Sequence, residues 1–298
     1  MNARAAVLRP ASDAPGRPSR TVADACARIG RAAVLALYDE LALAPKPGLV
    51  SFVDAGSHRD MDARTFLRSL FSLRRAFAAF THLGAGGDGL AALEREGLQA
   101  EARMLRATGG VNTHRGAIFT LGLLCAAAGR CVAERQALVD TALRAQLRAA
   151  WGDDLVRRAE RHTDSNGAIA ARRHGLRSAG REAAEGFPVL FDIVWPALRD
   201  ALAVGLDPAR ARLHALFAAM AALDDTCVVH RGGLQALRDV QAAARAFLDA
   251  GGGAAYDAPA RAAALHRALV GRHLSPGGSA DLLAAACWLQ RVTAAPRT

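Results

Sequence analysis

Polar side chains that could bind phosphates or move protons gather in the run T-G-G-V-N-T-H-R-G-A-I-F-T-L-G at 108–122. Two glycines are followed by Asn112, Thr113, His114 and Arg115, and an apolar run comes next. This pattern predicts a loop that leads into the first turn of a buried helix, with Asn112 or Thr113 as its cap. A helix start favours anions through its unpaired N–H groups, and this one also carries a histidine and an arginine.

Lys46 is the only lysine of the chain and lies in the sequence Pro45-Lys46-Pro47-Gly48. The preceding apolar periodicity predicts a helix from Thr21 to Ala44, which the prolines end because they cannot continue the hydrogen-bond ladder. We expect an exposed elbow here. A lysine in an arginine-rich chain suggests a compact point charge, as for a phosphate oxygen.

Acidic residues are dense in the next loop, S-F-V-D-A-G-S-H-R-D-M-D at 51–62. Asp54, Asp60 and Asp62 stand there beside His58 and Arg59. Carboxylates in a loop at this density suit an oxygen-ligated cation such as Mg²⁺. One of the last two acids could instead serve only to cap the helix expected from about Ala63 to Leu83.

Two further polar stretches lie near the C-terminus. The first, D-D-T-C-V-V-H-R-G-G at 224–233, holds Asp224, Asp225, His230 and Arg231. We expect it to be a loop between helices.

The second, H-L-S-P-G-G-S-A-D at 273–281, is a glycine turn that opens the last helix. Ser279 is a plausible cap and Asp281 falls in the first turn. Taken alone, capping is the preferred interpretation for both residues.

The composition favours packed helices. Hydrophobic residues make up 52% of the 298 and aromatic residues only 5%, and alternating strand patterns are absent. We predict an all-α protein of roughly ten helices, with one domain over 21–298 behind a disordered tail at 1–20. Further helices are expected at 89–107, 131–161 (one long helix, or two that join near Trp151), 168–181, 188–204 and 208–223. The polar stretches all fall at helix ends, which in a helical bundle can converge into a cleft.

The net charge of +10 suggests a phosphorylated or acidic partner. Aromatic and basic residues are not interleaved, so we expect no nucleic-acid partner. The five cysteines form no C-x-x-C pair and suggest a reduced, cytoplasmic protein.

We find no apolar segment long enough to span a membrane, and none of the Walker, G-x-G-x-x-G, G-x-S-x-G or H-E-x-x-H patterns. These residues predict a helical, magnesium-dependent enzyme that acts on a nucleotide or another phosphate ester.

Five ordered motifs resemble the triphosphoribosyl-dephospho-CoA synthase family. They are K-P-G-L-V at 46–50, G-S-H-R-D-M-D at 56–62, G-V-N-T-H-R-G-A-I-F at 110–119, H-R-G-G at 230–233 and S-P-G-G-S-A-D-L-L at 275–283. Within this family the chain looks closest to the malonate decarboxylase branch; the sister branch serves citrate lyase.

The resemblance implies that ATP and 3′-dephospho-CoA yield 2′-(5″-triphosphoribosyl)-3′-dephospho-CoA and free adenine. The product would pass to a phosphoribosyl-dephospho-CoA transferase that acts on an acyl carrier protein, and a homodimer is conceivable. Breaking the glycosidic bond builds positive charge at C1″, and we expect the carboxylate of Asp224 or Asp225 to stabilise it. His114 or His230 could transfer a proton. The remaining assignments are phosphate binding by Lys46, Arg59, Arg115, Arg231, Asn112, Gly277, Gly278 and Ser279, and magnesium binding by Asp54, Asp60 and Asp62.

Two alternatives remain open. A magnesium-dependent hydrolase that acts at a ribosyl C1″, similar to an ADP-ribosylglycohydrolase, would explain the carboxylates but would use water as the nucleophile. A basic helical module that binds RNA or an acidic protein would explain the arginines. The clustering of acids among the bases argues against this module.

Overall fold

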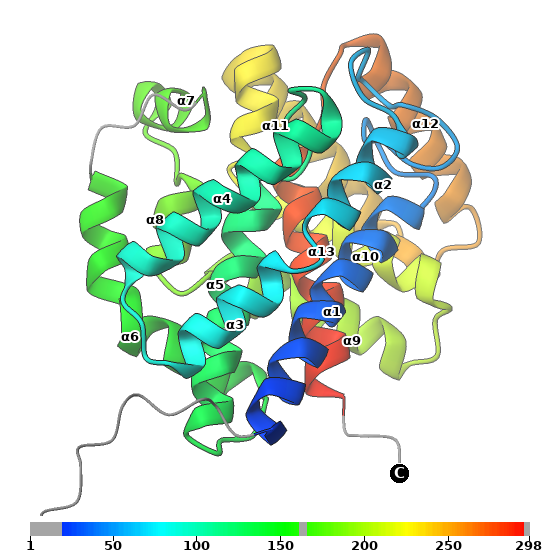
Figure 1. The fold of residues 1–298 in the computed structure, drawn as a ribbon. Coiled ribbons are helices and arrows are strands. Elements are labelled where there is room, and N and C mark those ends of the chain that lie inside the picture. The colour runs from blue at the N-terminus through cyan, green and yellow to red at the C-terminus, as the bar shows by residue number, and fades with distance from the viewer. Residues whose placement is uncertain (1–19, 161–165, 295–298) are drawn as a thin grey trace, which may run out of the picture.

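Helices account for the regular structure of this chain. A computed structural model describes residues 20–160 and 166–294, and within these ranges it contains helices and no strands (Figure 1). The predicted disordered tail lies almost wholly outside the described residues. The all-α prediction is confirmed, although the described residues form thirteen α-helices where we expected roughly ten. They are α1 (Arg20–Ala42), α2 (Ala63–Ser72), α3 (Ala76–Ala85), α4 (Leu90–Thr108), α5 (Arg115–Ala133), α6 (Asp140–Glu160), α7 (Asn166–His174), α8 (Ala179–Ala184), α9 (Trp195–Ala203), α10 (Pro208–Ala222), α11 (Thr226–Asp249), α12 (Ala258–Gly271) and α13 (Gly277–Thr293), with a π-turn at Leu190–Val194 and a 3₁₀-turn at Gly252–Ala254.

Several predicted boundaries were wrong. The helix expected over 63–83 is broken at 73–75, which lets α2 pack on α4 while α3 packs on α5. The stretch 131–161 is broken after α5 and not at Trp151, which lies inside α6 and donates to the carbonyl of Asp88 at 3.0 Å. The stretch at 168–181 is broken at 175–178, between α7 and α8. The stretch 224–233 is helical from Thr226, because Asp225 caps α11 there.

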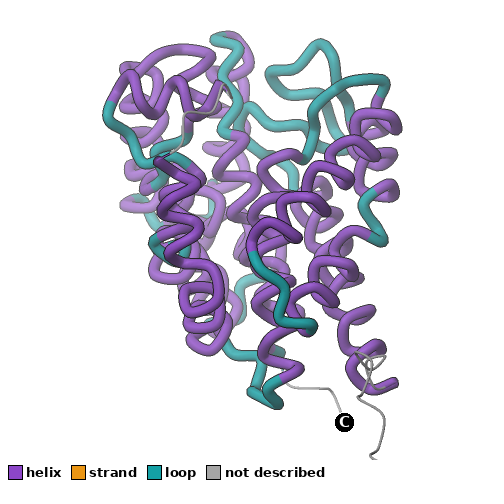
Figure 2. The backbone as a smooth tube through the Cα atoms, turned by 60° about the vertical axis from the view of Figure 1, so that its left-hand side comes forward, coloured by secondary structure: helices purple, strands orange, loops and turns teal. Residues whose placement is uncertain are grey.

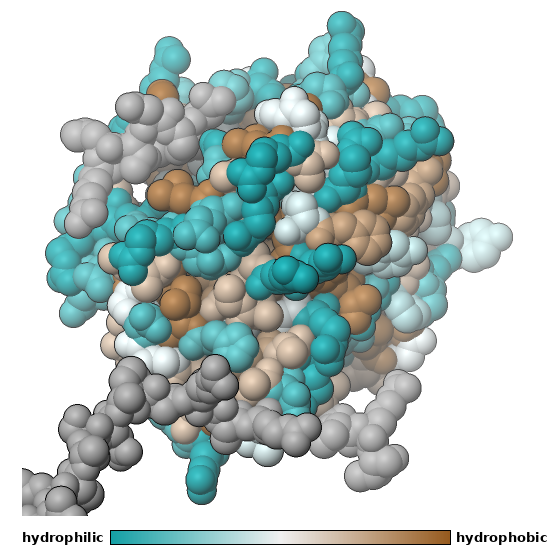
Figure 3. Space-filling view, viewed as in Figure 1, coloured by the Kyte–Doolittle hydropathy of each residue, from teal (hydrophilic) through white to brown (hydrophobic). Residues whose placement is uncertain are grey.

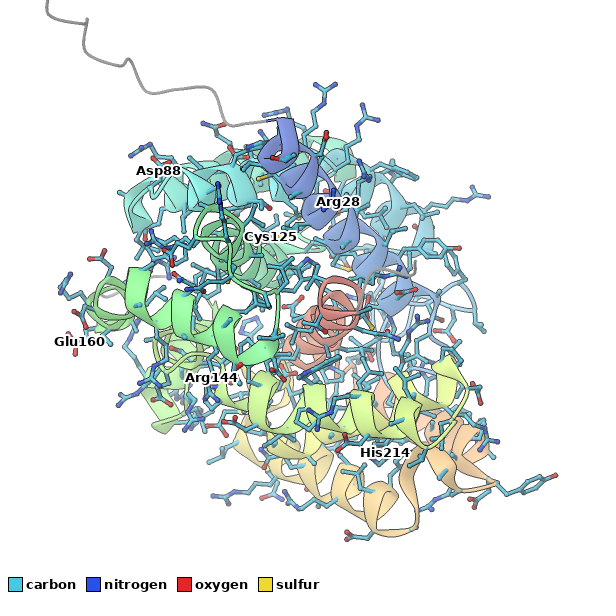
Figure 4. All side chains as sticks on the ribbon, turned by 90° about the horizontal axis from the view of Figure 1, so that it is seen from below. Arg28, Asp88, Cys125, Arg144, Glu160 and His214 are labelled. Carbon is cyan, nitrogen blue, oxygen red and sulfur yellow. The ribbon has the colours of Figure 1, made fainter. Side chains whose placement is uncertain are left out.

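The last helix, α13, lies in the middle of the bundle and packs against α1, α5 and α10 (Figure 1). Figure 2 shows the helices of the described chain joined by loops. Trp288 of α13 is fully buried and donates to the carbonyl of Ile29 in α1 at 3.3 Å. Arg291 of α13 and Arg212 of α10 both pair with Asp39 of α1. Seen from below, α5 and α13 occupy the interior, with Cys125 of α5 inside and Arg28 and Glu160 near the outside (Figure 4).

The closest helix–helix approach described here joins α3 to α5 through two glycines. A Cβ atom on Gly84 would lie 1.9 Å from the carbonyl oxygen of Ala126, and one on Gly129 would lie 2.0 Å from that of Thr81. Only the absence of side chains at these positions lets the two backbones meet. This contact fixes α5, and therefore the polar stretch just before it.

The surface carries hydrophilic side chains with apolar patches between them (Figure 3). The expectation that no apolar segment is long enough to span a membrane was wrong, because α5 has the length and composition to cross one. Most of its apolar window is buried inside the protein, as in the core helix of a bundle. The bent pair of α10 and α11 passes the same test of length and composition only when taken together.

We predict that Gly84→Ala lowers the free energy of unfolding by about 1–3 kcal/mol, because the new methyl group collides with the backbone of α5. Urea unfolding followed by circular dichroism would measure it. Gly152→Ala is the matched control: its nearest neighbouring atom lies 4.0 Å away, and an alanine inside α6 should stabilise by about 0.5–1 kcal/mol. Equal effects of the two substitutions would contradict the close approach.

Candidate active site

The four polar stretches meet where α1 ends and α5, α11 and α13 begin, so the predicted convergence is confirmed. Figure 1 shows α1 ending and α13 beginning on the same side of the molecule, near the turns of 43–62. Ser279 bonds to Asp225 across 54 residues of sequence. His58 lies 2.9 Å from Ser275 and 3.2 Å from Arg231. Loops that are remote in sequence therefore form one continuous polar region.

Lys46 is buried in this region, which overturns the expected exposed elbow. Its side chain is 1% exposed, and its Nζ donates to the carbonyl oxygen of Glu40 at 2.8 Å and to the carboxylate of the same residue. Burial raises the pKa of Glu40 and lowers that of Lys46, and the attraction between the two opposes both shifts. Because a buried charge needs a partner, Lys46 and Glu40 act as one unit. With its ammonium held by Glu40, Lys46 is not free at the surface to bind a phosphate.

Asp225 ties the starts of α11 and α13 together. Its Oδ1 accepts from the amides of Cys227 at 3.1 Å and Gly278 at 3.3 Å. Its Oδ2 accepts from the amide and the hydroxyl of Ser279 at 2.8 and 2.9 Å. Ser279 is thus not the cap of its own helix, which begins at Gly277; a carboxylate from another helix fills that place. Burial raises the pKa of Asp225, and these donors oppose the rise.

Asp281 lies against the start of α5. A Cβ atom on Gly116 would be 2.0 Å from an Asp281 carboxylate oxygen, so the glycine of the T-H-R-G sequence makes room for this acid. The amide of Ala117 donates to Asp281. Burial raises the pKa of Asp281 well above its usual range, and the nearby Glu40 and Asp225 raise it further. Sequence reasoning treated Asp281 as a helix-start residue only.

His114 is buried, and its orientation is set by two hydroxyl groups. Thr113 donates to the Ser69 hydroxyl at 2.7 Å, and Ser69 Oγ lies 2.6 Å from His114 Nδ1. His114 Nε2 is buried without a hydrogen-bond partner among the described residues. Burial, and then the positive charge of Lys46, lower the pKa of His114 to about 3. The ring is therefore neutral at pH 7.

The three predicted magnesium ligands have separate roles. Asp54 pairs with His266 at 3.2 Å, Asp62 caps α2 through the amide of Thr65, and Asp60 is exposed 3.7 Å from His58. Within 20–160 and 166–294, no three acids, histidines or cysteines gather as for a metal ion. The magnesium assignment therefore stays a prediction.

The side chains described so far form a polar cluster of Glu40, Lys46, Ser69, His114, Asp225 and Asp281. Asp224 and His230 line two pockets outside this cluster. Asp224 accepts from the amide of Arg177 at 3.0 Å and lines a pocket of about 470 Å³ together with Arg177 and Arg181. His230 is exposed and lines a pocket of about 210 Å³ beside Arg173 and His174 of α7. Asp224 is adjacent in sequence to Asp225, so the larger pocket adjoins the cluster.

The arginines predicted to hold phosphates all lie at the surface. Arg231 reaches the carbonyl of His273 at 3.2 Å and His58, while Arg115 pairs with Glu101. Arg59 is exposed in the 51–62 loop. Asn112 accepts from the Arg115 amide at 3.2 Å. The cap position of α5 is His114, whose side chain makes no capping bond, so the predicted cap at Asn112 or Thr113 is wrong.

Known proteins match nearly the whole chain. A family model described as ATP:dephospho-CoA triphosphoribosyl transferase matches residues 26–297. The chain belongs to this transferase family. A probable 2-(5''-triphosphoribosyl)-3'-dephosphocoenzyme-A synthase of Stutzerimonas stutzeri is 41% identical, covering 93% of this chain and 96% of the relative. A 2-(5''-triphosphoribosyl)-3'-dephosphocoenzyme-A synthase of Pectobacterium atrosepticum is 42% identical over 84% of each. No solved structure matches the chain.

The family membership confirms the resemblance drawn from the five motifs, and this chain is an enzyme of the transferase family.

Three members of the cluster were missed by sequence reasoning. Glu40 and Ser69 lie inside helices, and Asp281 resembles a helix cap. The sequence held one signal: the only lysine lies between two prolines, six residues after Glu40. This spacing lets the two side chains pair.

We predict that Lys46→Met lowers the free energy of unfolding by about 3–5 kcal/mol, since it leaves Glu40 buried without a partner. Adding Glu40→Gln should restore most of this loss, because no uncompensated charge then remains. Urea unfolding of the single and double variants would measure both effects. A double variant as unstable as Lys46→Met alone would contradict the pairing.

Protonation of His114 should destabilise the fold in acid. With the pKa of His114 lowered to about 3 from 6.5 in the folded state, the unfolded chain takes up a proton first as the pH falls. Stability is then lost by about 1.4 kcal/mol per pH unit as the pH falls from about 6.5 to about 3. In urea unfolding at pH 7 and pH 5, His114→Gln should lose less stability than the wild type. Exposed His82→Gln should behave as the wild type does.

Proposed function

We propose that this enzyme transfers the 5-triphosphoribosyl group of ATP to the 2′-hydroxyl of 3′-dephospho-CoA and releases adenine. The observation that carries the proposal is the family match over 26–297, together with the meeting of all the polar motifs in one region. In this reaction the 2′-oxygen bonds to C1″ and the C1″–N9 bond breaks. The electron pair of the broken bond leaves with adenine, and the triphosphate is retained.

We further propose that the product serves the acyl carrier protein of malonate decarboxylase, through a phosphoribosyl-dephospho-CoA transferase. The likeness of the motifs to that branch supports this choice over citrate lyase. We place the enzyme in the cytoplasm, in keeping with five free cysteines. A second copy as partner stays a prediction.

The pocket of about 470 Å³ beside Asp224 has a volume suited to part of a nucleotide. Arg177 and Arg181 lie on its wall, where both pair with Glu185 at 3.2 and 3.3 Å. We propose that phosphate oxygens of a substrate replace Glu185 as their partner, and that Asp224 stabilises the positive charge at C1″. Asp225 then has a positioning role, because the four bonds to its carboxylate orient the starts of α11 and α13.

We propose that Mg²⁺ enters with the triphosphate of ATP. The described acids do not gather into a three-ligand site, which suits an ion that takes most of its ligands from phosphate oxygens and water. Asp60, which is exposed in the 51–62 loop, is the predicted ligand best placed to meet such an ion. The ion would neutralise phosphate charge there.

Purified protein incubated with ATP, Mg²⁺ and 3′-dephospho-CoA should release adenine in equal amount with a heavier CoA species, as chromatography and mass spectrometry would show. Omission of 3′-dephospho-CoA should abolish adenine release, because the 2′-hydroxyl is the nucleophile. Adenine that forms at the same rate without 3′-dephospho-CoA would favour the ribosyl hydrolase. A folded protein that releases no adenine would refute both.

A further inference from the structure

Three carboxyl groups gather where α1 ends and α11 and α13 begin, and they differ in what is already bound to them. Glu40 pairs with Lys46, and four donors fill both oxygens of Asp225. Asp281 accepts from the amide of Ala117, and its residue is of intermediate exposure whereas Glu40 and Asp225 are buried. Of these three carboxyl groups, Asp281 is thus the one with spare hydrogen-bonding capacity at the least buried position.

The surroundings of Asp281 favour its protonated form. Glu40 from α1 and Asp225 from α11 face it with negative charge, and the Cys227 thiol from α11 lies within electrostatic reach. The positive charge of Lys46 is already paired with Glu40. The pKa of Asp281 is raised well above its usual range by burial and by these two acids. A carboxyl group near other carboxylates is harder to ionise, which favours the protonated form of the less neutralised one.

A second buried polar group near Asp281 has hydrogen-bonding capacity to spare. His114 is 3% exposed, and its Nε2 has no hydrogen-bond partner among the described residues. The positive charge of Lys46 acts on the His114 ring. His114 directly precedes Arg115 and Gly116 in the chain, and the Asp281 carboxylate packs against Gly116. A buried polar atom without a partner is costly unless a ligand completes it.

We propose that Asp281 is the general acid that protonates the adenine leaving group. This assignment rests on the proposed function. The Asp281 hydroxyl gives its proton to a ring nitrogen of the purine as the C1″–N9 bond breaks, so adenine departs neutral. The 2′-hydroxyl gives its proton to solvent as its oxygen bonds to C1″, and a proton from solvent restores Asp281. ATP and 3′-dephospho-CoA therefore give only adenine and the triphosphoribosyl product, with no net proton change at the enzyme.

The histidine considered earlier for this step is unsuited to it. His114 with a pKa of about 3 holds no extra proton near neutral pH, so it can orient a substrate through Nε2 but is not the acid. Gly116 gains a function from the same arrangement. Any side chain at 116 would displace the carboxyl group of Asp281 from the start of α5.

The test compares the wild type with Asp281→Asn, which keeps the shape of the side chain and its acceptor for Ala117. With ATP, kcat should fall by about 10²–10⁴-fold, the usual contribution of a general acid, while KM changes little. The wild-type kcat should decline as the pH rises through the Asp281 pKa, because the acid form is consumed, and this decline should be absent in the variant. The exposed Asp249→Asn is the matched control and should keep both the rate and the pH profile.

A change of leaving group separates an acid from a structural role. In 8-aza-ATP the base departs more readily as an anion, so the deficit of Asp281→Asn should shrink by at least about tenfold. An undiminished deficit, or a pH profile unchanged by the substitution, would overturn the proposal.

A second variant, Asp281→Glu, keeps an acid and should retain the alkaline decline with reduced kcat; loss of that decline would also overturn the assignment. If Asp281→Asn matches a wild type that releases adenine only with 3′-dephospho-CoA, the acid assignment fails and the transferase stands. If the wild type does not transfer at all, the proposed function itself fails.

Discussion

The carboxylate of Asp225 is the constraint on which the site depends. Helix starts carry unpaired N–H groups. Here one side chain bonds to N–H groups at the starts of two helices, and its bond to Ser279 joins residues 54 positions apart in the sequence. The bonds to Cys227, Gly278 and Ser279 fix the angle at which α11 and α13 enter the region. Once α13 is fixed, Asp281 is carried onto the start of α5, and the Gly116 backbone gives it room.

Buried charge is tolerated in this region because each group has a different means of compensation. Lys46 neutralises Glu40, backbone and hydroxyl donors solvate Asp225, and the raised pKa of Asp281 favours its neutral form. Such divergence among neighbouring titratable groups is typical of sites that perform acid–base chemistry. A glycosyl transfer needs these separate roles, since positive charge at C1″, a departing base and an incoming hydroxyl must each be met by a different group.

The scaffold is rigid where the site needs it to be. The glycine contact between α3 and α5 holds the start of α5, and Asp39 bridges α1, α10 and α13 through two arginines. The more exposed pockets beside α7 and α8 lie away from this framework. We infer that substrate phosphates are bound on the outer walls, while proton transfer occurs at the fixed helix starts.

Much of this protein follows from its sequence alone. The scarcity of aromatic residues and the helical periodicity predicted an all-α fold, and the five motifs identified the family, because both are local patterns of residue type and spacing. Tertiary structure decided which polar residues face one another. Lys46 looked like an exposed elbow and is buried, Ser279 looked like a cap and is itself held by Asp225, and Glu40 looked like an ordinary helix residue. These outcomes depend on contacts between residues far apart in the chain, and the desolvation that such contacts impose, which sets the protonation of Asp281 and His114, exists only once the helices have packed.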